Sequence, residues 1–320
     1  MRLVTNYQLE SNLTENQIEA DVATYFGRLS PFFGQSLRLL NINEQATGAD
    51  KLHKTRGIAY YFQFKAPIGL KSAASLKLPI TARKNESKLM GIRRFRHSER
   101  LEESPYSICF GLHDNKPPTV NQLQHNVLFA HEKPPFSRAM YVCPTELSEK
   151  SYVDEMQLPW WRRPFARPFH RDEARQLIVG QACHALSTAP FLRAHATVIP
   201  HALVTSADHY YSFSKHATDY AFHSPMVVDN GDPRRLSDFL SKQVEGIFAD
   251  DESTALLGDL VKQIYTGERE NILGIQLDLP ELGNEITWLQ SYGKEIKRKY
   301  GIRQIIALVD NRDFNNWPIV

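Results

Sequence analysis

Long hydrophobic runs and paired cysteines are both missing from this sequence of 320 residues. No stretch approaches the roughly 18 consecutive apolar residues that would indicate a membrane span. The first residues, MRLVTNYQLE, also lack the apolar segment of a signal peptide. Cys109, Cys143 and Cys183 lie far apart and form no CxxC pair, which argues against a disulfide framework or a structural zinc site. We therefore expect a cytoplasmic protein in a reducing compartment, with no membrane attachment.

Several common catalytic signatures are absent as well. The sequence contains no Walker loop, no GxSxG elbow and no Rossmann fingerprint, which weakens the case for a nucleotide-driven motor, a serine hydrolase or a dehydrogenase. What is present is the composition of a folded protein, because 42% of the residues are hydrophobic and 23% are charged.

The net charge of +2 conceals an uneven distribution along the chain. Residues 66–101 contain nine Lys or Arg and two Asp or Glu, whereas residues 238–285 contain three basic and eleven acidic residues. This division predicts a basic face for an anionic partner and an acidic region elsewhere. The alternative is two solvated surfaces that happen to differ in charge.

Hydrophobic periodicity predicts a helix at 15–29, where Thr14 and Gln17 form a capping box. The pattern then predicts strands at 36–44, 57–65 and 138–143, with a helix at 120–132 before the last of them. We interpret residues 1–150 as an α/β (α+β) core, a mixed β-sheet flanked by helices, with a basic insertion at 68–105.

Residues 151–320 form a second predicted unit, a C-terminal extension ending in helices. Its apolar patterns predict a helix at 172–188, short strands within 196–228, helices near 236–248, 256–264 and 285–300, and a final strand at 302–310. Its role is left open between recognition of a substrate and assembly with a homo-oligomeric or protein partner.

The chemistry-bearing residues gather early in the chain. Asp50 follows the turn Thr47-Gly48, and the two-residue period of the next strand places Gln63 and Lys65 on one side, about 7 Å apart along it. If the two strands form a hairpin, the Asp50 carboxylate approaches that face. Glu19 or Glu44 could add a second carboxylate, as a Mg²⁺ site for phosphodiester hydrolysis needs oxygen ligands and an activated water.

This arrangement resembles the PD-(D/E)XK nuclease signature, in the variant with Gln in the third motif. The resemblance rests on Glu19, the segment TGAD at 47–50 and the segment YFQFK at 61–65, together with the α-β-β-β-α-β order of the first 145 residues or so. It implies a restriction-endonuclease-like fold and a metal-dependent endonuclease acting on DNA rather than RNA, of a kind found in restriction, repair or antiviral defence. By the same resemblance, Asp50, Gln63 and Glu19 would ligate Mg²⁺ or Mn²⁺, and Lys65 would be the catalytic lysine.

Each of these residues also has a structural interpretation. Asp50 could stabilise a turn, Lys65 could protect an edge strand, and Glu19 could be a solvated helix residue. Gln63 could be a buried amide that is satisfied by its neighbours. Since Gln63 stands where a carboxylate is usual, a catalytically degenerate module that binds nucleic acid or a partner protein is the alternative function.

Two basic stretches are the candidates for gripping nucleic acid. The first follows the QFK strand and includes Lys84, Lys88, Arg93, Arg94 and Arg96. The second mixes aromatic and basic residues at 160–171 and includes Arg162 and Arg163. The alternatives are a solvated loop for the first stretch and aromatic anchors on the core for the second.

Overall fold

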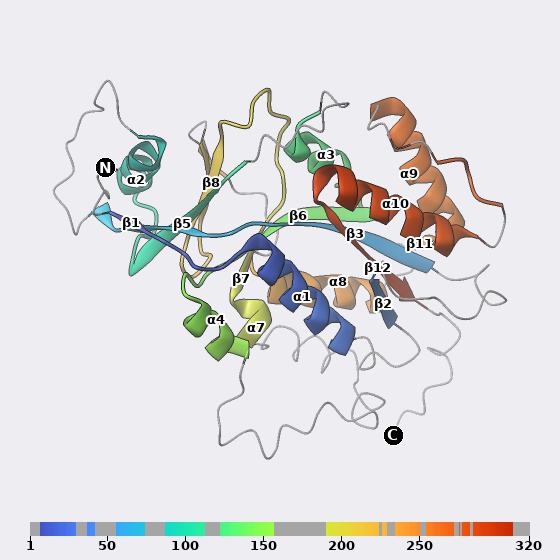
Figure 1. Ribbon diagram of the computed structural model, residues 1–320, viewed down its shortest axis with the longest axis horizontal. Coiled ribbons are helices and arrows are strands. Elements are labelled where there is room, and N and C mark those ends of the chain that lie inside the picture. The colour runs from blue at the N-terminus through green and yellow to red at the C-terminus, as the bar shows by residue number, and fades with distance from the viewer. Residues whose placement is uncertain are drawn as a thin grey trace, which may run out of the picture.

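Two β-sheets form the framework of the described chain, with helices packed on both faces of one of them (Figure 1). The computed structural model describes residues 7–29, 37–41, 56–73, 87–112, 122–156, 190–223, 226–228, 234–249, 254–271, 275, 277–281 and 284–309. The architecture is mixed α/β, as the sequence predicts.

The first sheet is centred on β3 (Arg56–Phe64). Its strand order is β2 (Leu37–Asn41), β12 (Arg303–Val309), β3, β6 (Ser137–Pro144) and β7 (His195–Val198), with β11 (Ala255–Leu256) pairing the start of β3. The pair β3 and β6 is parallel, and the other pairs are antiparallel. A parallel pair requires a crossover connection, and helix α3 (Gln124–Ala130) lies on that connection.

The second sheet is antiparallel throughout. Its order is β1 (Gln8–Leu9), β4 (Ile68–Lys71), β5 (Tyr106–Gly111), β8 (Tyr210–Ser214), β9 (Tyr220–His223) and β10 (Met226–Val227). Helix α2 (Lys88–Ser98) begins where the Ser87 hydroxyl accepts a hydrogen bond from the Met90 amide.

Strand β3 is buried on both faces, which explains why aromatic residues occupy both of its sides. Ala59 and Tyr61 belong to a core shared with α3, α9 (Leu257–Asn271) and α10 (Glu285–Tyr300). Tyr60, Phe62 and Phe64 face a second core. The helices on that side are α1 (Glu15–Leu29), α4 (Glu149–Met156), α7 (Pro190–Arg193) and α8 (Leu236–Ala249). In Figure 1 the two groups of helices lie on opposite sides of β3.

The sequence-based elements are largely confirmed within the described residues. The helices expected at 15–29 and 285–300 have those bounds, whereas the helix expected at 120–132 begins only at Gln124. The described part of the basic insertion at 68–105 supplies β4 and α2, and residues 74–86 of it lie outside the described residues. The helix expected at 172–188 lies outside the described residues.

The expected hairpin between the first two strands of this sheet is wrong. Strand β12 lies between β2 and β3, pairing Ile305 with Asn41 on one side and with Tyr60 on the other. The chain beyond residue 150 also supplies β7 to the first sheet and β8 to the second. The two regions expected on either side of residue 150 therefore build the same two sheets.

None of the described helices is long and apolar enough to cross a lipid bilayer.

Three buried histidines pair with buried tyrosines in these cores. The distance from the hydroxyl to a ring nitrogen is 2.9 Å for Tyr141 and His125, 2.7 Å for Tyr292 and His131, and 3.0 Å for Tyr152 and His195. Burial is the main cause that lowers the pKa of each imidazole from 6.5 to about 4. All three rings are therefore neutral in the folded protein near neutral pH.

We expect the free energy of unfolding to fall as the pH is lowered from about 6.5 toward 5. In that interval the imidazoles bind protons in the unfolded chain but stay neutral in the folded protein. These three histidines by themselves contribute a limiting slope of about 4 kcal/mol per pH unit. Urea unfolding at several pH values above and below about 6.5 measures this slope. A stability that stays constant across that interval would contradict the assignment of neutral buried histidines.

Candidate functional site

Lys65 lies immediately after β3 and is buried, with 1% of its surface exposed. Its amide donates to the Val142 carbonyl at 3.0 Å, which continues the parallel pairing by one residue. The ammonium donates to Gln124 Oε1 at 3.3 Å and lies 3.9 Å from Glu15 Oε1. It also lies 5.9 Å from the centre of the Tyr141 ring. Four elements, β3, β6, α1 and α3, thus fix the position of one buried cation.

Burial has a direct electrostatic effect on Lys65. Desolvation of the ammonium lowers its pKa from 10.5 to about 8, and the nearby Glu15 carboxylate opposes part of that shift. The protein therefore holds a lysine whose charge is less strongly favoured than that of a surface lysine, next to a carboxylate that is partly open to solvent.

Gln63 lies two residues before Lys65 on the same side of β3, as the strand period predicts. It is buried, with 4% exposure. Its Nε2 donates to the Phe64 carbonyl at 3.3 Å, but its Oε1 has no hydrogen-bond partner. Leaving a buried polar atom unpaired costs about 1–3 kcal/mol, so this oxygen is suited to a ligand.

A pocket of about 540 Å³ opens beside Lys65 and Glu15. Its wall is formed by the segment between β1 and α1, the turn after β3, and the end of β5. The lining residues include Glu10, Ser11, Glu15, Lys65, Pro67 and Phe110. Gln63 is not among them. The pocket gives solvent and small ligands access to the Glu15 carboxylate and the lysine beside it.

Glu19, the accessory metal ligand implied by the resemblance, forms ion pairs with residues of α10 and β12 and does not contact Lys65. Its Oε1 accepts a hydrogen bond from Arg303 Nη1 at 2.7 Å and pairs with Lys297. Glu15, one turn earlier on the same helix, is the carboxylate that lies beside Lys65. The helix begins at Glu15 because Thr14 caps it, with its hydroxyl accepting from the Gln17 amide. The sequence therefore placed the helix correctly, but it did not single out Glu15.

Several other expected site residues lie outside the described residues. These are Asp50, Glu44, Lys84, Arg162 and Arg163. Within the described residues, no group of three or more His, Cys, Asp or Glu side chains could hold a metal ion. Two of the oxygens that the described part of the site offers next to Lys65 are the Glu15 carboxylate and the unpartnered Gln63 amide. Both are hard oxygen donors of the type that Mg²⁺ prefers.

Two of the arginines expected to bind nucleic acid, Arg93 and Arg96, are buried and do not form a phosphate-binding surface. Arg93 is buried, and its Nε and Nη2 donate to the carbonyls of Lys71 and Ser72, each at 2.6 Å. Arg94 is half-buried, and Lys88 is exposed and pairs with Asp208 at 2.6 Å. Arg93 thus holds α2 against the end of β4.

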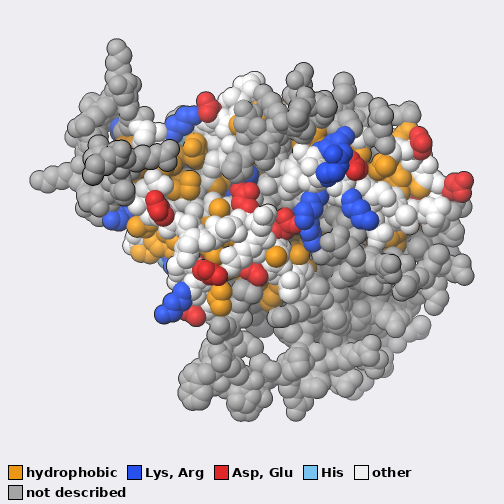
Figure 2. All heavy atoms as spheres, in the orientation of Figure 1, with side chains coloured by type: hydrophobic (Ala, Val, Ile, Leu, Met, Phe, Trp, Pro, Cys, Tyr) orange, Lys and Arg blue, Asp and Glu red, His pale blue; other side chains and the backbone are white. Residues whose placement is uncertain are grey.

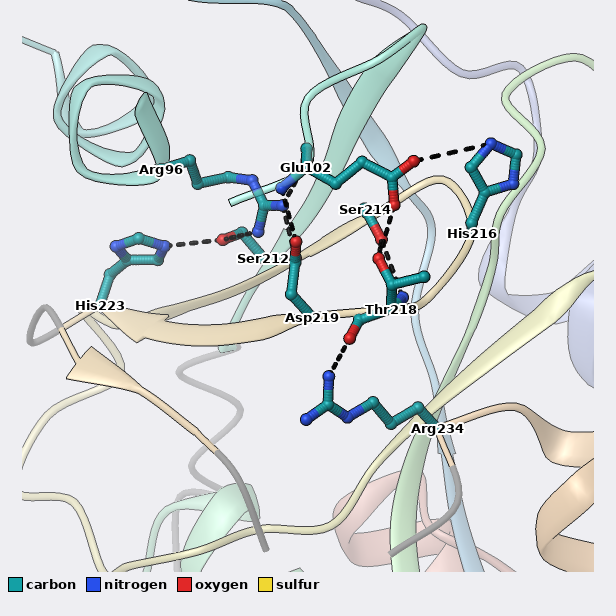
Figure 3. Close-up of polar contacts among 9 residues, drawn as sticks. All are labelled: Arg96, Glu102, Ser212, Ser214, His216, Thr218, Asp219, His223 and Arg234. Carbon is teal, nitrogen blue, oxygen red and sulfur yellow. Dashed lines mark hydrogen bonds and ion pairs between the residues drawn. The ribbon is translucent and has the colours of Figure 1, made fainter. Parts of the chain in front are cut away.

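Arg96 is fully buried at the centre of a polar network (Figure 3). Its Nη2 donates to Asp219 Oδ1 at 2.5 Å and to the Glu102 carbonyl at 2.7 Å, and its Nη1 donates to Ser212 Oγ at 3.2 Å. Asp219 also accepts from the Glu102 amide at 2.7 Å. Arg96 therefore links α2 to β8 and to the turn before β9, and its guanidinium is not available to a phosphate.

We expect Arg96→Met to destabilise the protein by about 3–5 kcal/mol, because it leaves the largely buried Asp219 carboxylate without its cation. Lys88→Met is the matched control on the same helix. Its ion pair with Asp208 is exposed, so its removal should change the unfolding temperature little. Thermal unfolding of both variants measures the difference. Equal unfolding temperatures would show that the network does not hold α2 in place.

The comparisons with known proteins add no relationship to this geometry. The sequence matches no protein-family model, and searches of curated proteins and of solved structures find no significant match. A functional assignment therefore depends on the residues around Lys65 themselves.

Proposed function

We propose that this protein is a metal-dependent nuclease that hydrolyses phosphodiester bonds, with DNA as the substrate. The observation that carries the proposal is the grouping around Lys65. A buried lysine contacts a partly exposed carboxylate at the edge of a pocket, two residues after a buried amide oxygen that has no partner. Structural ion pairs account for the first contact, but they leave the Gln63 oxygen unexplained.

Each side chain has a distinct role in this proposal. Glu15 and Gln63 offer oxygens to a divalent cation, and Asp50 supplies the further carboxylate. When bound, Mg²⁺ or Mn²⁺ would polarise the scissile phosphate and lower the pKa of a water molecule. Lys65, held by Gln124 and Glu15, presents a positive charge to the negative charge that develops on the phosphate during attack. Its fixed position means that little reorganisation is needed at that moment.

The arrangement of elements also supports a restriction-endonuclease-like core. Helix α1 covers β3, and a parallel partner follows β3 through a crossover containing α3. One feature departs from the expected order, since β12 lies between β2 and β3. A role in restriction or antiviral defence within the cytoplasm is part of the same proposal and rests on the resemblance of the motif.

The second candidate function is a nuclease-like module that binds nucleic acid or a partner protein without cutting. Gln63 favours it, because a neutral amide oxygen is a weaker ligand for Mg²⁺ than the carboxylate usual at that position. The two functions differ in one measurable property, which is metal-dependent turnover.

We expect the protein to cleave plasmid or oligonucleotide DNA with Mg²⁺ or Mn²⁺ and to be inactive with EDTA. Glu15→Gln, Asp50→Ala and Lys65→Met should each lower the cleavage rate by at least about 100-fold, because each removes a ligand or the fixed cation. Lys65→Met keeps the buried volume and removes a buried charge, so it should fold. Cleavage rates under single-turnover conditions measure the effect.

Glu19→Gln is the matched control, with the same chemical change one helical turn away. It should retain cleavage activity, although the loss of a charged partner for Arg303 should lower its stability. Full activity in both Glu15→Gln and Lys65→Met would remove the basis of the site assignment. Absence of cleavage by the unaltered protein with either metal would favour the binding module.

Gln63→Glu tests the unusual residue directly. A carboxylate binds Mg²⁺ more strongly than an amide, so we expect cleavage to reach half of its maximal rate at a lower Mg²⁺ concentration than in the unaltered protein. In a degenerate site the same substitution should create measurable Mn²⁺ binding in calorimetry. An unchanged or higher metal requirement would show that position 63 does not contact the metal.

A further inference from the structure

The last two turns of α10 form an exposed basic surface. Four of the residues 294–299 are basic and one is acidic, in the sequence KEIKRK. Lys294, Lys297 and Arg298 are exposed, and Lys299 is partly buried. Figure 2 shows Lys and Arg side chains gathered over α10 on the face that it displays. We call the exposed residues Lys294, Lys297 and Arg298 the α10 basic surface.

The C-terminal end of α10, which carries this surface, is joined to the candidate site by two consecutive hydrogen bonds. Gln124 accepts from the Lys65 ammonium through its Oε1 and donates through its Nε2 to the carbonyl of Tyr300, the last residue of α10. Gly301, which follows with a positive φ of 63°, ends the helix next to the same amide. The C-terminal end of α10 is therefore set against the residue that holds Lys65.

Helix α1 makes a second connection between the two. Glu19 pairs with Lys297 of α10 and with Arg303 of β12, while Glu15, one turn earlier, contacts Lys65. The pocket and the α10 basic surface thus adjoin the same first turns of α1. In Figure 2 acidic side chains lie beside the basic ones on this face.

The helix dipole alone does not account for these charges. Cations are favoured near a helix C-terminus, but the effect falls off within the last turn, and Lys294 lies before it. Arg298 pairs with Glu295, yet its side chain keeps 66% exposure. By contrast, Arg93 and Arg96, the basic residues first expected to bind nucleic acid, are buried and hold α2 in place.

We propose that the α10 basic surface holds the phosphodiester backbone of a nucleic acid beside Lys65. The inference rests on the proposed function for its choice of ligand and extends it by naming the residues that bind substrate. Lysine and arginine contacts to phosphates are independent of sequence and release counterions, so this binding weakens steeply with salt.

The test measures binding without catalysis, in EDTA, by fluorescence anisotropy with labelled duplex DNA, single-stranded DNA and single-stranded RNA of equal length. The variant is Lys294→Gln with Arg298→Gln, which leaves the Glu19 ion pairs intact. We expect weaker binding than in the unaltered protein and a salt slope, log K against log salt, that is smaller by about two. The ligand with the largest loss identifies the strand type that the surface holds.

The matched control is Lys242→Gln with Lys262→Gln, which removes the same charge from exposed positions on α8 and α9. Helix α9 starts beside Arg56, at the end of β3 opposite Lys65 and about 30 Å away by strand rise. Affinity and salt slope should stay close to those of the unaltered protein. Equal values for the α10 variant and this control overturn the inference for all three nucleic acids.

The same proteins separate this inference from the proposed function. Cleavage with Mg²⁺ that is unaffected by the α10 substitutions, together with unchanged binding, keeps the nuclease and removes the α10 basic surface as its binding site. Binding that depends on α10, without cleavage in Mg²⁺ or Mn²⁺, keeps the inference and removes the enzymatic activity.

Discussion

The burial of β3 on both faces and its pairing on both edges is the constraint on which the rest of this structure depends. Residues 57–64 of this strand are buried, so each polar group on them must be satisfied by the protein or by a ligand. Lys65 meets this requirement through Gln124 and Glu15. Gln63 meets it through its nitrogen only, which is why the unpaired oxygen is the most informative atom in the described part of the site.

The sequence predicted this strand well because its signal is local. Aromatic and β-branched residues dominate GIAYYFQF, and the two-residue period places Gln63 and Lys65 on one side without any tertiary information. The sequence could not decide whether Glu15 or Glu19 lies beside Lys65, because that depends on tertiary structure. The two residues lie one turn apart on nearly the same helix face, so only the position of α1 relative to β3 and α10 distinguishes them. Nothing within the helix sequence encodes that crossing.

The basic stretch shows a second limit of reading charge from sequence. A run of arginines is typical of a solvated or nucleic-acid-binding surface, because a buried guanidinium needs partners. The partners of Arg96 come from more than 100 residues later in the chain, at Ser212 and Asp219, and from the Glu102 backbone. The sequence could not show that these groups converge. In the structure, the run of arginines therefore serves to hold α2 in place from inside the protein. The short basic segment of α10, which reads as an ordinary helix end, is the exposed one.

The place of β12 has a consequence for how the molecule is assembled. The strand that separates β2 from β3 comes from residues 303–309, so the middle of the first sheet joins residues 37–62 to a segment near the other end of the described chain. Such pairing gives a high contact order, because a long loop must close before its contacts stabilise the fold. During synthesis, the edge of β3 that pairs with β12 stays open until residues 303–309 emerge from the ribosome. Of the groups around Lys65, Gln124 completes its hydrogen bonds only at that stage, because its Nε2 donates to the carbonyl of Tyr300.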